Sequence, residues 1–152
     1  TEEDIRRGLE SAVIEPGRMT PIQLERCLLV DDTYNASPRA VRAAIDWLAH
    51  RSGHRILVMG GLSDLGDATS LEMEALGAYA KSQGIEQLVA TGTAAPIAEG
   101  FGVGSFYIET IEETSSHLSQ MVAYADVMLI KGSRSAQMNR VIEALQCQHG
   151  GQ

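Results

Sequence analysis

Three short segments of the sequence carry side chains that could bind a polar or anionic ligand. Residues 31–38 read DDTYNASP, residues 60–66 read GGLSDLG, and residues 131–134 read KGSR. Each segment directly follows an apolar run that is typical of a buried β-strand. In a parallel sheet, ligands bind in the crevice beyond the carboxyl ends of the strands. The three segments together are therefore the candidate site.

The first segment offers hydrogen-bonding groups that suit a nucleoside. The Asp32 carboxylate could accept hydrogen bonds from ribose hydroxyls, and the Asn35 amide, which both donates and accepts, could bind a base edge. Tyr34 lies between them in the sequence. The same residues also suit a plain turn, in which Asp31 and Asp32 cap the backbone and Tyr34 packs on the edge of the sheet. Spacing alone leaves both interpretations open.

The third segment concentrates positive charge in an otherwise acidic chain. Lys131 and Arg134 flank Gly132 and Ser133. Two cations and backbone N–H groups are therefore expected at one spot before a helix, where anions bind. Arg134 could hold a carboxylate through two parallel hydrogen bonds, whereas Lys131 would act as a point charge. In the alternative, Lys131 extends from the sheet end to solvent and Arg134 pairs with a surface acid.

The second segment matches no phosphate-binding motif. Gly60, Gly61 and Gly66 do not fit G-x-G-x-x-G, and G-x-x-x-x-G-K-[ST] is absent from the whole sequence. By itself, the segment is best explained by glycines that let a helix pack closely on the sheet. The chain is not expected to hold ATP phosphates in a phosphate loop of its own.

Histidine and cysteine positions indicate neither a metal site nor a catalytic triad. The two cysteines are too few for a disulfide framework or a metal cluster, and both are expected to be free thiols. The four histidines are predicted at helix ends, on the surface or in the tail. The cysteines are Cys27 and Cys147, and the histidines are His50, His54, His117 and His149.

The alternation of apolar runs with stretches of helical period predicts the fold. Most of the runs are almost wholly apolar, as expected for strands that are buried on both faces of a parallel sheet. Helices must then cover both faces, connected by right-handed crossovers. We predict a Rossmann-like α/β fold with a doubly wound, mostly parallel sheet. The predicted strands are 27–30, 55–59, 87–90, 105–108 and 127–130.

Helices are predicted between and after these strands from apolar residues at helical spacing. Ser37 and Pro38 suit the start of the first helix, and Gly84 suits the end of the second. Short helices are also expected at 1–10 and 94–99. The predicted apolar stripes are Val41, Ala44, Ile45 and Leu48; Leu71, Ala75, Ala78 and Tyr79; Ile111, Leu118 and Val122; and Met138, Val141, Ile142 and Leu145.

Length and charge limit the class of protein. The 152 residues suit one domain, and a net charge of −8 argues against a broad basic surface for nucleic acid. No apolar run approaches the ~20 residues that span a bilayer. No export signal is recognisable, so a cytoplasmic location is expected. We predict a linker over 1–16, one folded domain over 17–149 and a frayed tail over 150–152.

The order and separation of the three segments resemble those of the C-terminal domain of the Mur ligases, the ATP-dependent amide-forming enzymes of peptidoglycan synthesis. The Gly-Arg tract at 17–19 and the first segment match the family pattern, the third segment is intact, and Met138 also fits. The second segment matches in part, because Gly61 replaces an aspartate of the family and Asp64 a glutamate. Met73 stands where a histidine is expected. The resemblance covers most of the chain.

The resemblance is greatest to the members that join D-alanyl-D-alanine to UDP-N-acetylmuramoyl-tripeptide. It implies that the chain is the C-terminal domain of such a ligase, with 1–16 as a linker or the end of a central ATPase domain, and that it is inactive alone. In the full-length enzyme, ATP with Mg²⁺ would convert the tripeptide carboxylate to an acyl phosphate, which the dipeptide amine attacks. This domain would close over ATP and position the amine.

The implied partners are the N-terminal and central domains and the two substrates, with neither nucleic acid nor a membrane. No cofactor is expected on the fragment, and no catalytic residue or metal ligand within this domain alone. Two other functions remain open: a stand-alone Rossmann-type module that binds a nucleotide or sugar phosphate, and the C-terminal domain of a related ligase that adds another amino acid. The implied nucleotide contacts are Asp32, Tyr34 and Asn35, the implied substrate contacts are Lys131, Ser133 and Arg134, and Asp64 is a further candidate from the partial match.

Overall fold

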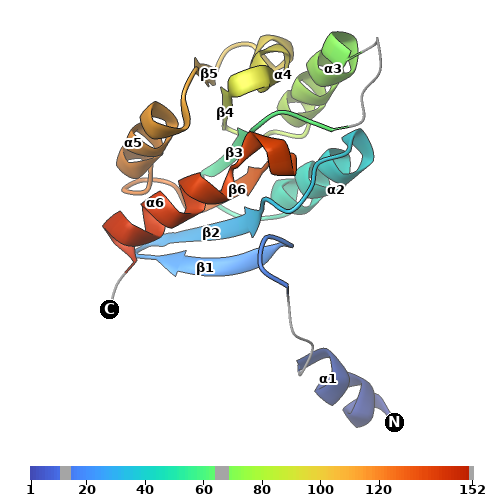
Figure 1. Ribbon diagram of the computed structural model, residues 1–152. Helices are drawn as coiled ribbons and strands as arrows, with labels where there is room; N and C mark the ends of the chain where they lie inside the picture. The colour runs from blue at the N-terminus through green and yellow to red at the C-terminus, as the bar shows by residue number, and fades with distance from the viewer. Residues whose placement is uncertain (11–14, 64–68, 151–152) are drawn as a thin grey trace.

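A six-stranded mixed sheet forms the centre of the computed structural model, which describes residues 1–10, 15–63 and 69–150. The strand order is β1-β2-β6-β3-β4-β5, with β1 antiparallel to β2 and all other neighbours parallel. The last strand in the chain therefore lies between β2 and β3 (Figure 1). The strands are β1 (Thr20–Leu24), β2 (Cys27–Asp32), β3 (Arg55–Met59), β4 (Gln87–Thr91), β5 (Ser105–Ile108) and β6 (Val127–Lys131).

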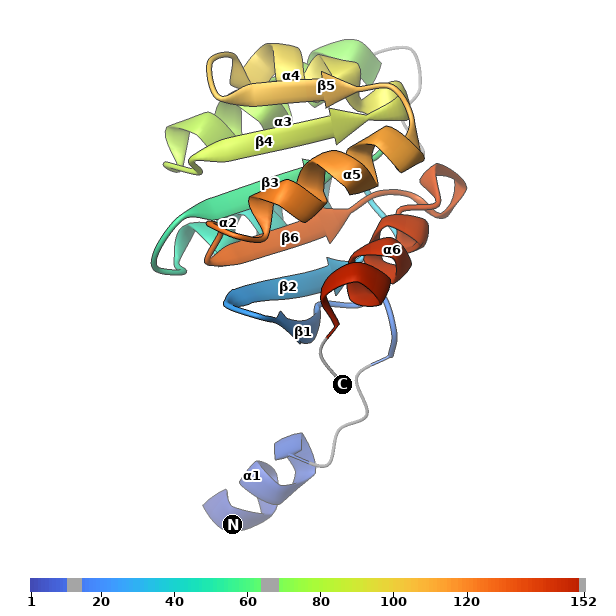
Figure 2. The same cartoon turned by 90° about the vertical axis from the view of Figure 1, so that its left-hand side faces the viewer.

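Helices cover both faces of this sheet, which confirms the predicted α/β architecture. Helices α2, α3 and α4 pack on one face, and α5 and α6 pack on the other (Figure 2). The chain runs from β2 to β5 through helices on the first face and returns to β6 through α5 on the second. The helices are α1 (Glu2–Glu10), α2 (Pro38–Ala49), α3 (Thr69–Ser82), α4 (Ala95–Phe101), α5 (Ile111–Met121) and α6 (Asn139–His149), with 3₁₀ turns η1 (Gly92–Ala94) and η2 (Arg134–Ala136).

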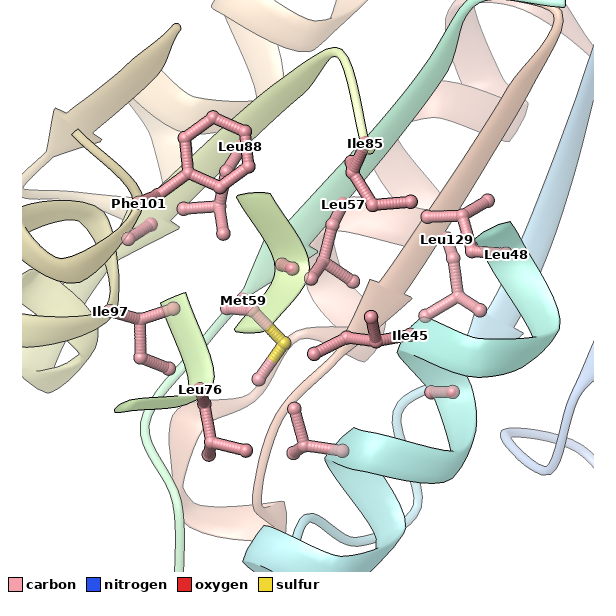
Figure 3. Packing of buried hydrophobic residues seen from close by; sticks show 14 of the residues in the cluster. Ile45, Leu48, Leu57, Met59, Leu76, Ile85, Leu88, Ile97, Phe101 and Leu129 are labelled. Carbon is pink, nitrogen blue, oxygen red and sulfur yellow. The ribbon is translucent and has the colours of Figure 1, made fainter. Parts of the chain in front are cut away.

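Alternate residues of the central strands belong to two separate hydrophobic cores. In β3, Ile56 and Val58 face α5 and α6, whereas Leu57 and Met59 face α2, α3 and α4. All four side chains are completely buried. Figure 3 shows Leu57 and Met59 beside Ile45 of α2. Because successive side chains of a strand point to opposite faces, a continuous apolar run is what a doubly covered strand requires.

The five predicted strands are all present, and β3 and β5 have the predicted bounds. Strand β1 has no counterpart among the predictions. Its burial alternates along the strand, and Pro21 lies opposite Val30 of β2. A proline is tolerated at this place because β1 is an edge strand, where the missing N–H group interrupts no second ladder.

The predicted start and buried face of α2 are confirmed. The Ser37 hydroxyl accepts a hydrogen bond from the backbone N–H of Ala40 (3.2 Å), and Pro38 occupies the first turn. The four predicted apolar residues of this helix are buried. Gly84 adopts a φ of +86° just after α3, which is the left-handed conformation expected of a residue that ends a helix.

The predicted buried face of α3 is wrong. Leu71 is 73% exposed, whereas Leu76 and Ala80 are buried. Two glycines decide this orientation, because they let α4 cross α3 at backbone contact distance. A Cβ atom on Gly77 would lie 1.9 Å from the carbonyl oxygen of Ile97, and one on Gly100 would lie 1.9 Å from that of Glu74.

A network around Arg55 fastens the amino end of β3 to its surroundings. The guanidinium donates to Glu86 through Nε (3.1 Å) and Nη2 (2.9 Å), and also to the carbonyl oxygens of Ala49 and Gly84 (2.7 Å each). The Arg55 backbone N–H donates to the same carboxylate (2.8 Å). Burial alone would raise the pKa of Glu86, but these hydrogen bonds outweigh it and hold that pKa below its usual value.

We expect Glu86→Gln to flatten the acid side of the stability profile. A carboxyl group whose folded pKa is depressed stabilises the fold above its unfolded pKa, about 4.3 for glutamate, and the stabilisation is lost as pH falls through the folded pKa. Urea unfolding at pH 7 and pH 3 should therefore show a smaller loss of stability in the variant than in the parent. Glu99→Gln, on an exposed position of α4, is the control. Parallel profiles for Glu86→Gln and the parent would contradict the expectation.

Both cysteines are free, as predicted, and burial raises the pKa of the Cys27 thiol to about 11.

Helix α1 lies apart from the sheet in both views (Figures 1 and 2). Within the described residues, no helix has the length and apolar character needed to cross a membrane. The predicted division into 1–16, 17–149 and 150–152 stays a prediction.

Candidate functional site

The carboxyl ends of β2, β6 and β3 meet where the chain leaves the sheet in opposite directions. The β2 loop (residues 33–37) leads to α2 on one face, and the β6 loop (residues 132–138) leads to α6 on the other. Connections that diverge in this way open a crevice at the switch point of the sheet. The first and third polar segments of the sequence lie at this crevice.

A buried ion pair joins these two loops. The Lys131 ammonium lies 2.7 Å from Oδ2 of Asp32 and donates to the carbonyl oxygen of Asn35 (2.9 Å). The Lys131 side chain is 4% exposed and that of Asp32 is 13% exposed. Lys131 therefore does not extend to solvent, and its charge is balanced within the protein. The other Asp32 oxygen accepts from the backbone N–H of Met19 (3.2 Å).

The neighbouring carboxylate, Asp31, has a local role. It points to the opposite face of the sheet from Asp32, because consecutive residues of a strand alternate. Its Oδ1 accepts from the hydroxyl (2.7 Å) and the backbone N–H (3.2 Å) of Thr33. The turn interpretation therefore holds for Asp31, while Asp32 joins the two loops.

The Asn35 side chain is held by its oxygen. Oδ1 accepts from the backbone N–H of Ala36 (2.8 Å) and from the hydroxyl of Ser63 (3.1 Å), which belongs to the loop after β3. Asn35 is exposed. Because both hydrogen bonds use the amide oxygen, the Nδ2 group is the end that can donate to a ligand.

Tyr34 presents an exposed ring between two arginines. Its ring centroid lies 4.1 Å from the guanidinium carbon of Arg18 and 5.3 Å from that of Arg134, and the residue is 40% exposed. The Tyr34 backbone N–H donates to the carbonyl of Gly17 (2.9 Å). Gly17 has a φ of +82°, and a Cβ there would lie 3.2 Å from the Tyr34 nitrogen. The segment around Arg18 is thus fastened to the β2 loop.

Close backbone contact also joins the loops after β3 and β6. The N–H of Gly60 donates to the carbonyl of Lys131, and the N–H of Ser133 donates to that of Gly61 (2.8 Å each). A Cβ on Gly132 would lie 3.2 Å from the Cα of Gly60. The Ser133 N–H is therefore already bonded, which corrects the expectation that it is free for an anion.

Two cavities flank the β6 loop. The larger, about 630 Å³, extends along α6 and is lined by Tyr34, Arg134 and Arg140 among others. The smaller, about 250 Å³, is lined by Thr93, Ser133, Ser135, Gly61 and Glu109 among others. Successive residues of the loop thus line different cavities, with Arg134 on the larger and its two serine neighbours on the smaller.

The structure brings together most of the residues that the sequence analysis selected. Asp32, Asn35 and Lys131 are linked directly, and Tyr34 contacts Arg134. Asp64 lies outside the described residues. Arg18 belongs to the same cluster but was not among the selected side chains, although the Gly-Arg tract in which it lies was the available signal.

Metal binding finds no support in the described part of the chain. Among residues 1–10, 15–63 and 69–150, no three His, Cys, Asp or Glu side chains lie close enough to hold a metal ion together.

Comparison with known proteins gives consistent matches. The family model described as "Mur ligase, glutamate ligase domain" matches residues 17–134. The UDP-N-acetylmuramoyl-tripeptide–D-alanyl-D-alanine ligase of Escherichia coli K12 is 37% identical over 150 residues, which cover 96% of this chain and 33% of that protein. The chain thus spans about a third of the length of the curated relatives it matches.

Solved structures agree with the sequence matches. A crystal structure of MurF from Acinetobacter baumannii superposes with a TM-score of 0.84 at 32% identity, covering 94% of this chain and 33% of that one. The MurF ligase from Thermotoga maritima, solved in complex with ADP, superposes with a TM-score of 0.78 at 27% identity, covering 95% of this chain and 36% of that one.

Proposed function

The chain belongs to the Mur ligase C-terminal family, the glutamate ligase domain, and on this premise we propose that it forms the C-terminal domain of an ATP-dependent ligase that joins D-alanyl-D-alanine to UDP-N-acetylmuramoyl-tripeptide. The remaining domains of that ligase would hold the UDP-sugar and the ATP phosphates. The share of this domain is to bind the adenosine part of ATP and to position the dipeptide amine. ATP, when bound with Mg²⁺, supplies the phosphoryl group that activates the tripeptide carboxylate.

One observation carries this proposal: two loops separated by 99 residues meet in the Asp32–Lys131 ion pair. The β2 loop, which follows Asp32, carries nucleoside-type donors and acceptors. The β6 loop, which follows Lys131, carries the exposed Arg134 cation and the hydroxyl groups of an anion or peptide site. A ligase needs both kinds of site side by side, because positioning the amine on the activated carboxylate contributes several kcal/mol to lowering the barrier.

The nucleotide side consists of Asp32, Tyr34 and Asn35. The Tyr34 ring is 40% exposed and lines the larger cavity, so a base could contact its exposed part beside the guanidinium groups of Arg18 and Arg134. The Nδ2 group of Asn35 is available to a base edge. Asp32 already accepts from Lys131 and Met19, and as an ionised carboxylate it has lone pairs left for a ribose hydroxyl. The phosphates would lie outside this chain.

We expect Asn35→Ala in the full-length ligase to raise the KM for ATP about fivefold, as one hydrogen bond is lost. The KM for the dipeptide should change less, which makes it the internal control. Steady-state kinetics with each substrate varied in turn provides the measurement. Tyr34→Ala should act in the same direction, because the contact between its ring and the base is lost. If the KM for ATP is unchanged in both variants, the assignment of the β2 loop to the nucleotide is wrong.

The amine-substrate side consists of the β6 loop. Ser133 contributes a hydroxyl to the smaller cavity, and Arg134 presents an exposed guanidinium on the other side of the loop. We assign the dipeptide carboxylate to Arg134, whose planar fork matches it, and the remainder of the dipeptide to the smaller cavity. Lys131 is then a positioning residue, because its ammonium holds the β2 loop in place rather than facing a ligand.

We expect Arg134→Lys in the full-length ligase to lower kcat/KM for the dipeptide about tenfold while acyl-phosphate formation is retained. The charge remains, but the bidentate geometry is lost. Rapid-quench measurement of acyl phosphate, together with kinetics in the dipeptide, separates the two steps. Arg39→Lys, on the exposed surface of α2, is the matched control. Loss of acyl-phosphate formation with unchanged affinity for the dipeptide would instead assign Arg134 to the nucleotide beside Tyr34.

The function itself is tested on the longer polypeptide encoded by the gene. A phosphate loop ending in Gly-Lys-Ser or Gly-Lys-Thr upstream of Thr1 is expected. The purified product should convert ATP to ADP over many turnovers only when UDP-N-acetylmuramoyl-tripeptide and D-alanyl-D-alanine are both present, and mass spectrometry should detect the joined product. Calorimetric titration of the 152-residue chain with Mg-ATP should show weak binding or none. Sub-micromolar binding by this chain would favour a stand-alone nucleotide-binding module.

A further inference from the structure

Three side chains far from the candidate site form a linear hydrogen-bonded relay. The hydroxyl of Ser119 lies 2.7 Å from Nε2 of His149, and Nδ1 of His149 lies 3.0 Å from Oε1 of Glu25. The residues come from the body of α5, the end of α6 and the turn between β1 and β2. The sequence analysis recognised no triad pattern among the histidines, because these three residues are far apart in the sequence. The His149 side chain is 17% exposed.

The chemistry of the partners fixes the roles within this relay. A carboxylate only accepts hydrogen bonds, so Nδ1 of His149 carries its hydrogen toward Glu25. In the neutral ring, Nε2 then has a lone pair and accepts from the Ser119 hydroxyl. Glu25 is held in a turn with a φ of +49°, and its carbonyl oxygen accepts from Nε2 of Gln23 (3.1 Å). Nucleophile, base and orienting acid therefore stand in hydrogen-bonding order.

Serines elsewhere on α5 use their hydroxyls differently. Ser115 donates to the carbonyl of Ile111 (2.8 Å), and Ser116 donates to that of Glu112 (3.1 Å). These bonds to the preceding turn are usual for serine inside a helix. Ser119 is instead directed to a histidine. Ser116, which is exposed one turn earlier on the same helix, is thus a natural reference for an unactivated serine.

We propose that Ser119 is an activated nucleophile that reacts with small phosphonyl and acyl donors, with His149 as general base and Glu25 as its orienting residue. With an alkyl fluorophosphonate, Oγ of Ser119 attacks phosphorus and forms the O–P bond. The P–F bond breaks, and fluoride leaves with the bonding electron pair. The hydroxyl proton passes to Nε2 of His149, and Glu25 stabilises the resulting imidazolium. This proposal is independent of the ligase function.

The surroundings of Ser119 limit the reaction to a single event per chain. Ser119 lies inside α5, where backbone N–H groups are bonded to carbonyls four residues earlier. Such groups do not form an oxyanion hole, and that element supplies much of the catalysis in serine hydrolases. We therefore expect stoichiometric modification of Ser119 without turnover of esters.

The test uses the 152-residue chain, an alkyl fluorophosphonate as the probe, and mass spectrometry of intact protein and peptides. Ser119 should be modified at least ten times faster than Ser116. His149→Gln should slow modification of Ser119 about 10²-fold, the order of a general-base contribution, and leave Ser116 unchanged. Glu25→Gln, at an exposed turn, should slow it less. Thermal unfolding of each variant establishes that it is folded.

Two results would overturn the proposal. One is modification of Ser119 at the rate of Ser116, which would mean that the relay does not activate the hydroxyl. The other is an unchanged Ser119 rate in a folded His149→Gln variant, which would exclude the imidazole as the base. If His149→Gln does not fold, the Glu25→Gln variant decides, and an unchanged rate there overturns the orienting role.

Discussion

Replacement of Lys131 by methionine will lower the free energy of unfolding by about 3 kcal/mol. The substitution leaves the Asp32 carboxylate without its partner in a largely buried position, and removing one member of a buried ion pair costs about 3–5 kcal/mol. The lower end of this energy range applies because the Asp32 side chain is still 13% exposed to solvent. The lost hydrogen bond to the Asn35 carbonyl acts in the same direction. For a domain of this size the melting temperature should fall by roughly 6–12 °C.

Chemical denaturation of three variants checks this expectation. Asp32→Asn combined with Lys131→Met should recover part of the loss, because no uncompensated charge remains. Arg26→Met is the matched control, since Arg26 pairs with Asp126 at 2.6 Å but the side chains are 56% and 38% exposed. Such an exposed pair contributes about 0–1 kcal/mol. Equal destabilisation by Lys131→Met and Arg26→Met would show that burial of the Asp32–Lys131 pair has no energetic consequence.

Gly77→Ala will destabilise the protein by about 2–3 kcal/mol, although alanine favours helices by about 1 kcal/mol over glycine. The added methyl group would lie 1.9 Å from the backbone carbonyl oxygen of Ile97. No side chain can turn away to relieve this contact, so α3 and α4 must separate, and overpacking of this kind costs about 1–3 kcal/mol or more. Contacts of Leu76 and Ala80 with the core would loosen with it.

Urea unfolding again provides the measurement. Ala75→Leu adds a larger group to an exposed position of the same helix and should change stability by less than about 0.5 kcal/mol. Gly100→Ala makes the reciprocal contact with the Glu74 carbonyl and should resemble Gly77→Ala. Unchanged or increased stability of Gly77→Ala would mean that the crossing of α3 and α4 adapts without cost.

The sequence predicted elements well where local chemistry determines them. Strand β3 is an uninterrupted apolar run, and α2 begins with a serine cap and a proline, so both could be recognised from neighbouring residues. The buried face of α3 could not, because Leu71 and Leu76 each belong to a stripe with helical spacing. The choice between the stripes depends on α4, which crosses at Gly77. That contact is tertiary and leaves no periodic signal.

In the candidate site, too, one part could be predicted from the sequence and another part could not. The proximity of the polar residues after the strands could be predicted, since strand ends of a parallel sheet share one edge. Their pairings were not predictable, because Asp32 and Lys131 are 99 residues apart. An isolated Lys-Gly-Ser-Arg segment indicates a lysine that is free to bind an anion, whereas Lys131 is paired with a carboxylate of the same chain. The assignment of these residues to nucleotide and dipeptide stays a prediction.

The position of β6 has a consequence for how the chain acquires its structure. β6 forms the bridge between the β1–β2 hairpin and the β3–β4–β5 half, yet it is the last strand to leave the ribosome. Until it is available, β2 and β3 have no shared neighbour, and the backbone N–H and C=O groups along their facing edges stay unpaired. Pairings over such long separations are slow to form, because the entropy of closing the intervening loops must be met first. A nascent chain that stalls before β6 is thus exposed to aggregation, and completion of the sheet coincides with the end of synthesis of this domain.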